Sequence, residues 1–203
     1  MDLVTFIIPT IGRNTLRNSI KSLLNQTETN WKAIIIFDGI KCNIKNNDER
    51  IKIIEIDKMG CGKNNAGNVR NHGMSLVETK WIAFLDDDDT ISNNYIRTFY
   101  SEIRSHTNID VLIFRMNLNN TFLPKLNTDN FYKFDVGISF IMKKEIFNNN
   151  LKFISDNAED FLYLDLIRNN NYCICISPYV MYFVKSHLNS RLISSIKGNR
   201  VFI

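Results

Sequence analysis

Short apolar runs alternate with segments of helical periodicity along the first half of the chain. Most of the runs end at a proline or an aspartate, and such continuous runs are typical of strands buried on both faces of a parallel sheet. The pattern predicts strands at Leu3–Ile8, Ala33–Phe37, Ile51–Ile56, Trp81–Leu85 and Val111–Arg115. Apolar positions three or four residues apart predict three helices. The first begins at Asn14 or Thr15, the second spans Asn64–Val77, and the third runs from about Ser92 to Arg104.

The second half of the chain is less regular. The polar segment Asn117–Lys133 is expected to be a long loop. Beyond it, the pattern predicts a strand at Gly137–Met142, a helix at Asp156–Arg168, and two strands, Cys173–Ser177 and Tyr179–Val184, separated by Pro178. No repeat or linker interrupts the chain, and Lys185–Ile203 receives no assignment.

This alternation predicts an α/β fold with a mostly parallel central sheet flanked by helices. The 203 residues fit a single domain. In open sheets of this kind, ligands bind outside the carboxyl ends of the strands. Asp38 and the run Asp86–Asp89 both follow predicted strands, so we expect them to share a site.

The four adjacent aspartates are candidates for a metal site. Along an extended backbone, side chains two positions apart share a face, which pairs Asp86 with Asp88 and Asp87 with Asp89 unless the backbone turns. Oxygen ligands at a strand end suit Mn²⁺ or Mg²⁺. The alternative is a solvated acidic loop before the helix that begins near Ser92.

Composition and charge bear on which partners the protein can bind and where it works. The net charge of +4 suits an anionic ligand, but the basic residues are scattered, so no nucleic-acid partner is expected. Four cysteines form neither a disulfide framework nor zinc-finger spacing. We expect no membrane span and no signal peptide, and therefore a cytoplasmic protein. The sequence does not decide between a monomer and a homo-oligomer.

Several motifs together resemble the family 2 glycosyltransferases, which are inverting enzymes of the GT-A (Rossmann-like) fold. The matching segments, in chain order, are Phe6–Thr10, Leu24–Thr27, Ile36–Gly39, Gly67–Asn71, Trp81–Asp89, Gly137–Phe147 and Ala158–Phe161, with the similarity ending near His187. The resemblance implies one GT-A domain over residues 1–203. Residues 1–115 would bind the nucleotide-sugar, and residues 116–203 would carry the acceptor and catalytic functions.

For the donor nucleotide, the resemblance implies a site lined by Pro9 and Thr10. Asp38 is similar to the aspartate that hydrogen-bonds the uracil edge, Arg70 to an arginine that helps to hold the base, and Arg13 to a basic residue beside the nucleotide. The sequence departs from the family at two positions, Ile11 and Phe37, where an aromatic residue and an acid are usual. UDP-sugars are therefore the expected donors, with thymidine and guanosine nucleotides as alternatives.

For the chemistry, the resemblance implies that Asp86 and Asp88 are a D-x-D pair, with Asp86 on the ribose side of the nucleotide and Asp88 on the metal; Asp87 is expected to contact the nucleotide as well. Asp160 resembles the general base that accepts the proton of a glycan or small-molecule hydroxyl. His187 resembles a metal- or phosphate-contacting histidine. The spacing alone allows a simpler role for the Asp160 region, because Asp156 and Glu159 have the spacing of a capping box.

Two other functions stay open at this point. A nucleotidyltransferase also uses acidic metal ligands, but it requires a glycine-rich loop after the first strand, where this chain has only Gly12. A non-catalytic sugar-nucleotide-binding protein would not need both Asp88 and Asp160.

Overall fold

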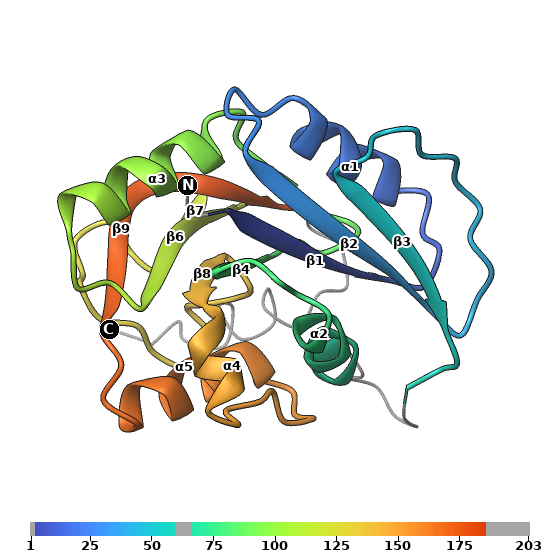
Figure 1. Ribbon diagram of the computed structural model, residues 1–203. Coiled ribbons are helices and arrows are strands. Elements are labelled where there is room, and N and C mark those ends of the chain that lie inside the picture. Colours follow the sequence, from blue (N-terminus) through green and yellow to red (C-terminus); the bar gives the residue numbers. More distant parts are fainter. Residues whose placement is uncertain (1–2, 60–65, 186–203) are drawn as a thin grey trace, which may run out of the picture.

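A nine-stranded sheet forms the centre of the computed structural model, which describes residues 3–59 and 66–185 (Figure 1). Its strands are β1 (Val4–Thr10), β2 (Trp31–Asp38), β3 (Ile51–Ile56), β4 (Trp81–Phe84), β5 (Thr90–Ile91), β6 (Val111–Leu118), β7 (Thr121–Leu123), β8 (Phe140–Lys143) and β9 (Ile174–Val184). Their order is β3-β2-β1-β4-β8-β6-β9-β5, and β7 pairs with β6.

The parallel part of the sheet is built from the apolar runs of the first half. Strands β1 to β4 all pair in parallel, and β6 pairs in parallel with β9. Strand β8 runs antiparallel between β4 and β6. The predicted α/β class with a mostly parallel sheet is therefore confirmed.

Helices cover both faces of the sheet. They are α1 (Leu16–Leu24), α2 (Ala66–Ser75), α3 (Tyr95–Ser105), α4 (Lys144–Asn148) and α5 (Glu159–Asn169). Figure 1 shows α1 and α3 on one face and α2, α4 and α5 on the other. Among the described residues, no helix is long and apolar enough to cross a membrane.

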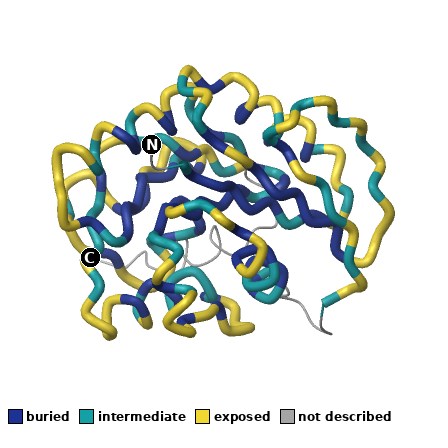
Figure 2. The backbone as a smooth tube through the Cα atoms, in the orientation of Figure 1, coloured by how far each residue is buried: buried dark blue, intermediate teal, exposed yellow. Residues whose placement is uncertain are grey.

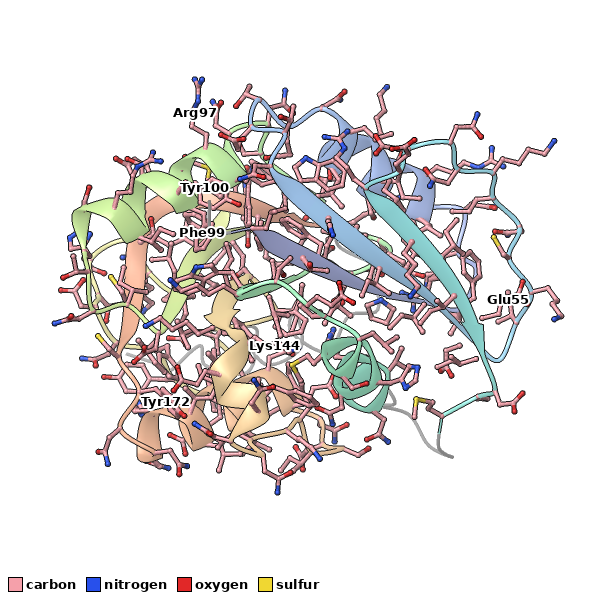
Figure 3. All side chains as sticks on the ribbon, viewed as in Figure 1. Glu55, Arg97, Phe99, Tyr100, Lys144 and Tyr172 are labelled. Atoms are coloured by element: carbon pink, nitrogen blue, oxygen red, sulfur yellow. The ribbon has the colours of Figure 1, made fainter. Side chains whose placement is uncertain are left out.

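Each long helix turns an apolar stripe toward the sheet. In α3, Phe99 points to the core while Arg97 projects into solvent, as Figure 3 shows. Figure 2 shows the resulting pattern, with buried strands at the centre and exposed residues on the outer surfaces of the helices. The burial of each large apolar side chain contributes roughly 1.5–3 kcal/mol to folding.

Helix α2 lies unusually close to the sheet because of Gly73. A Cβ atom at this position would lie 2.6 Å from the Ile7 side chain and 2.8 Å from that of Ile36. The close approach brings Arg70, which is on the same helix, to the carboxyl ends of β1 and β4, where the site described below is formed.

Several predicted elements differ from the structure. Pro178 does not divide the last strand, because β9 continues past it through a bulge. Ile113 pairs with Ile176 and Arg115 pairs with Val180, so an advance of two residues along β6 matches an advance of four residues along β9. A bulge accommodates a proline that cannot donate to the ladder.

The predicted loop Asn117–Lys133 begins as a hairpin rather than a loop. Strand β6 extends to Leu118, and β7 returns beside it after Asn119 and Asn120, whose φ angles are 51° and 63°. Such positive φ angles are those of a tight type I′ hairpin turn, which asparagine tolerates. The short elements β5 and α4 were not predicted.

Candidate active site

The carboxyl ends of the central strands open into one cavity of about 450 Å³. Nine of the ten candidate site residues line it, and they come from elements far apart in the sequence: Pro9, Thr10, Arg13, Asp38, Arg70, Asp86, Asp87, Asp88 and Asp160. The tenth, His187, lies outside the described residues. The expected meeting of Asp38 with the aspartate run at one sheet edge is therefore observed.

The aspartate run forms a turn rather than an extended segment. The Asp89 N–H donates to the Asp86 carbonyl at 3.2 Å, and the turn is centred on Asp87 and Asp88. As a result, carboxylate oxygens of Asp86, Asp88 and Asp89 lie within 4.8 Å of one another. The expected pairing of Asp86 with Asp88 is confirmed, but Asp89 does not pair with Asp87, because the turn moves Asp89 to the side of Asp86 and Asp88.

Asp87 points away from this cluster. Its carboxylate accepts a hydrogen bond from the Thr10 hydroxyl at 2.6 Å and one from Arg13 at 2.8 Å. Arg13 also contacts Asp88 at 3.0 Å, so a single guanidinium bridges two of the four acids. Asp87 thus fastens the turn to the end of β1.

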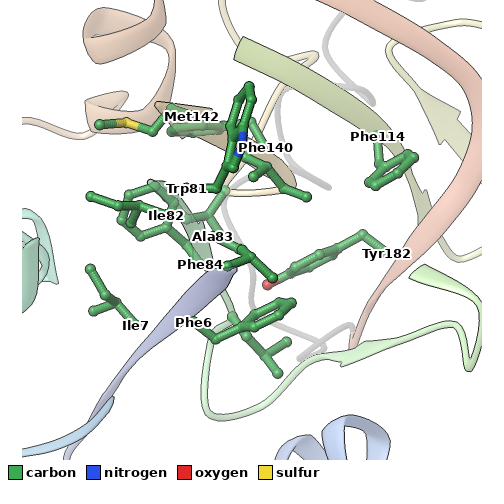
Figure 4. Packing of buried hydrophobic residues seen from close by; sticks show 14 of the residues in the cluster. Phe6, Ile7, Trp81, Ile82, Ala83, Phe84, Phe114, Phe140, Met142 and Tyr182 are labelled. Carbon is green, nitrogen blue, oxygen red and sulfur yellow. The ribbon is translucent and has the colours of Figure 1, made fainter. Parts of the chain in front are cut away.

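Helix α1 and the end of strand β9 hold the turn. The Ser19 hydroxyl, from α1, donates to the Asp89 carbonyl at 2.7 Å. From β9, the Tyr182 hydroxyl accepts the Asp86 N–H at 3.1 Å, and the Lys185 N–H donates to the Asp89 carboxylate at 2.8 Å. Figure 4 shows the Tyr182 side chain pointing into the core toward Phe6 and Phe84. The backbone of the acidic turn is therefore fixed in place.

The three converging carboxylates fit a hard divalent cation. Burial raises the pKa of Asp89 to about 8, and the nearby Asp86 charge adds to this effect. Clustered oxygen ligands of this kind are those that Mn²⁺ and Mg²⁺ prefer. A cation would neutralise the repulsion between Asp86, Asp88 and Asp89, which makes these residues the candidate ligands.

Arg70 connects the acidic turn to helix α5. Its side chain is 3% exposed, and its guanidinium lies 2.6 Å from Asp86, 2.6 Å from Glu159 and 3.5 Å from Asp160. Burial opposes the positive charge, but the three carboxylates outweigh it and hold the pKa of Arg70 above its ordinary value. The planar group also faces the Phe153 ring at 5.6 Å.

Asp160 lies in the first turn of α5, across Arg70 from the acidic turn. Its side chain is 26% exposed to the cavity. Burial raises the pKa of Asp160 to about 7; the Arg70 charge lowers this value, and the charges of Asp86 and Glu159 raise it. A carboxylate that titrates near neutral pH is suited to accept a proton from a hydroxyl.

The family model described as Glycosyl transferase family 2 matches residues 5–187. The chain belongs to glycosyl transferase family 2. The fold and the order of the motifs along the chain agree with that membership.

Two relatives of this family 2 chain are bacterial glycosyltransferases. It is 27% identical to the poly(ribitol-phosphate) beta-N-acetylglucosaminyltransferase TarP of Staphylococcus aureus (strain N315), over the whole chain and 69% of TarP. It is 29% identical to the glycosyltransferase GlyA of Streptococcus pneumoniae serotype 4, over 50% of the chain and only 15% of GlyA. The chain thus spans a small part of some of its relatives.

A solved structure shares the fold of the family 2 chain. The crystal structure of S. aureus TarS 1-349 in complex with UDP-GlcNAc superimposes with a TM-score of 0.76 at 18% identity. The match covers 96% of this chain and 61% of the TarS chain. This similarity confirms the GT-A fold.

Two residues that the resemblance assigns to the donor nucleotide both have protein partners in the structure. Arg70 was expected at the nucleotide base, but its guanidinium contacts Asp86, Glu159 and Asp160, so a contact with the base stays a prediction. Asp38 lies in the cavity, is 6% exposed and accepts the Met59 N–H at 2.7 Å. Its contact with uracil also stays a prediction.

Glu159 belongs to the site, although its spacing from Asp156 predicted a role in a capping box. The capping box with Asp156 does not form, because α5 is preceded by Ala158 and Asp156 accepts the Ala158 N–H at 3.0 Å instead. The Glu159 carboxylate accepts the Gly67 N–H at 3.0 Å, at the start of α2, as well as bonding Arg70. Glu159 therefore joins two helices at the wall of the cavity, which it also lines.

Proposed function

We propose that this chain transfers a sugar from a nucleoside-diphosphate sugar, with UDP-sugars as the expected donors, to a hydroxyl of a glycan or small-molecule acceptor, with inversion at the anomeric carbon. The observation that carries the proposal is the pairing, across one cavity, of a three-carboxylate turn with a separate carboxylate whose pKa is near 7. Membership in family 2 argues against the nucleotidyltransferase alternative.

Two observations support a UDP-sugar donor. TarP is named as an N-acetylglucosaminyltransferase, and the TarS structure contains UDP-GlcNAc. In this chain, Asp38 lies buried at the end of β2 and lines the cavity, where a carboxylate can accept the N–H of a uracil edge. UDP-GlcNAc is therefore the first donor to test.

The proposed reaction is a single displacement. The acceptor oxygen forms a bond to the anomeric carbon as the bond from that carbon to the diphosphate oxygen breaks with its electron pair. Asp160 accepts the acceptor proton. A Mn²⁺ or Mg²⁺ ion held by Asp86, Asp88 and Asp89 would supply positive charge for the leaving diphosphate. Arg70 keeps Asp160 and the acidic turn at a fixed separation.

Donor binding is expected to raise the melting temperature of the protein in the presence of Mn²⁺. A ligand that binds only the folded state adds RT ln(1 + [L]/Kd) to stability, about 2.7 kcal/mol at ~100 times Kd. A thermal-shift comparison of UDP-GlcNAc, UDP-glucose, GDP-mannose and dTDP-glucose checks this. A larger shift with a GDP- or dTDP-sugar would reject the uridine assignment, and no shift with any of them would reject the proposed donor class.

Replacing Asp88 with Asn is expected to weaken Mn²⁺ binding in the presence of UDP. The amide keeps the shape of the side chain but removes one negative charge from the cluster. We expect a loss of affinity of at least ~10–100-fold, the range found even for residues that only support metal ligands. Isothermal titration calorimetry measures it, and Asp165→Asn, which changes an exposed carboxylate on α5, is the matched control. Equal Mn²⁺ affinity in both variants would place the metal elsewhere.

A further inference from the structure

A tight turn at residues 132–135 carries two exposed aromatic side chains. The Asp135 N–H donates to the Tyr132 carbonyl at 3.1 Å, and the Tyr132 N–H donates to the Asp135 carboxylate at 2.5 Å. Tyr132 is 64% exposed and Phe134 is 49% exposed. The turn is thus closed by its own hydrogen bonds while both of its rings face solvent.

Phe134 has a backbone conformation that is unfavourable for its side chain. Its φ angle is +74°, in the third position of the turn, where glycine or asparagine is usual. A bulky residue with positive φ is an outlier whose strain the surrounding structure must support. Because the ring is half exposed, burial in the core does not account for it. A role in binding gives a physical reason for an aromatic ring at this position.

Both ends of this segment are anchored beside the candidate base. On one side, the Phe131 ring packs against that of Phe161, the residue after Asp160, at 6.2 Å. On the other side, Gly137 lies so close that a Cβ atom there would be 3.9 Å from the Asp160 carboxylate. The three residues from Phe134 to Gly137 can extend over at most about 11 Å. Phe134 is therefore within reach of a short oligosaccharide that has one hydroxyl at Asp160.

A buried arginine holds the preceding part of the loop. Arg115 is 2% exposed, and its guanidinium donates to the carbonyl oxygens of Pro124 at 2.9 Å and Thr128 at 3.0 Å, and to that of Lys125. Arg168 covers the Phe131 ring at 4.7 Å. These contacts order the loop before any ligand arrives, which lowers the entropic cost of binding.

We infer that Tyr132 and Phe134 form an acceptor subsite, in which the rings stack on the apolar face of a sugar ring of the acceptor. The subsite is separate from the donor cavity, which neither residue lines. Aromatic rings offer a large apolar face at little conformational cost, and the tyrosine hydroxyl adds a polar group for sugar hydroxyls. The inference rests on the proposed function, because it assumes that the hydroxyl at Asp160 belongs to a carbohydrate.

Phe134→Asn is the direct test, because asparagine tolerates a positive φ angle and removes only the ring. The probe is a printed array of defined oligosaccharides, to which labelled protein binds in the presence of UDP and Mn²⁺. We expect Phe134→Asn and, separately, Tyr132→Ser to weaken binding to the glycans that the wild type retains by about 10-fold, the order expected for the loss of one aromatic contact. The matched control is Leu24→Asn, which removes a side chain that is 44% exposed on the opposite face of the sheet.

The outcomes separate this subsite from the proposed function. Unchanged glycan binding by both ring variants, or a wild type that retains no glycan, would overturn the subsite. A melting temperature of Phe134→Asn that is no lower than that of the wild type excludes misfolding as the cause of a loss, and Tyr132→Ser provides a second variant without the strained backbone. If glycans bind but no nucleotide-sugar raises the melting temperature, the donor proposal fails and the subsite stands.

Discussion

Replacing Asp160 with Asn is expected to reduce sugar transfer by about 10²–10⁴-fold, the usual contribution of a positioned general base. The amide has nearly the same shape but cannot accept the acceptor proton. Asp160 does not belong to the carboxylate cluster of the acidic turn, so Mn²⁺ and UDP-GlcNAc binding should persist. Initial rates of UDP release in the presence of acceptor, together with the thermal shift by UDP-GlcNAc, measure the two effects separately.

The control for this variant is Asp165→Asn. Asp165 lies on the same helix, its carboxylate pairs with Arg168, and it does not line the cavity. This variant should transfer sugar at the wild-type rate. If Asp160→Asn retained transfer within a few-fold of wild type, the proton acceptor would have to be another group.

The same residue should give the reaction a pH dependence. The base is active when deprotonated, and the pKa of Asp160 is raised to about 7, first by burial. The value of kcat/KM, which reports the free enzyme, should therefore rise with pH through about 7 and fall tenfold per unit below it. This limb should be absent from the residual activity of Asp160→Asn.

The sequence pattern predicted most of the parallel half of the sheet because β1, β2 and β4 are buried on both faces. A run such as Trp81–Phe84 has no polar position that could suit a solvent-exposed face. The shorter antiparallel elements gave no such signal: β5 is only two residues long, and its pairing with β9 joins residues more than ninety positions apart. Tertiary contact, rather than local preference, determines these elements.

The sequence predicted which residues line the candidate site, but not the hydrogen bonds and ion pairs between them. Strand ends explain why Asp38 and Asp86 share a cavity. Nothing local indicates that Glu159 bonds Gly67, 92 positions away, or that Tyr182 supports the Asp86 backbone through the core. Asp89 lies beside Asp86 and Asp88 only because the backbone turns. An extended strand would place Asp89 on the opposite side.

Replacing Arg70 with Met is expected to cost about 3–5 kcal/mol of folding free energy, the range measured when one partner of a buried ion pair is removed. The guanidinium contacts three carboxylates while only 3% exposed, so its loss leaves Asp86, Glu159 and Asp160 facing one another without a counter-charge. Urea unfolding at pH 7.5 measures the change. Arg50→Met is the matched control: Arg50 pairs with Asp48 near the surface, and such a pair contributes at most ~1 kcal/mol.

Acidification distinguishes charge repulsion from a simple loss of packing in Arg70→Met. The Arg70 charge lowers the pKa of Asp160, so without it that pKa should rise above about 7. A group with a raised pKa in the folded state takes up a proton more readily when folded than when unfolded, so lowering the pH favours folding. The deficit of Arg70→Met relative to wild type should therefore shrink between pH 8 and pH 6. A deficit that is constant over this interval would mean that Arg70 contributes through packing, and that the link between the acidic turn and the base is not electrostatic.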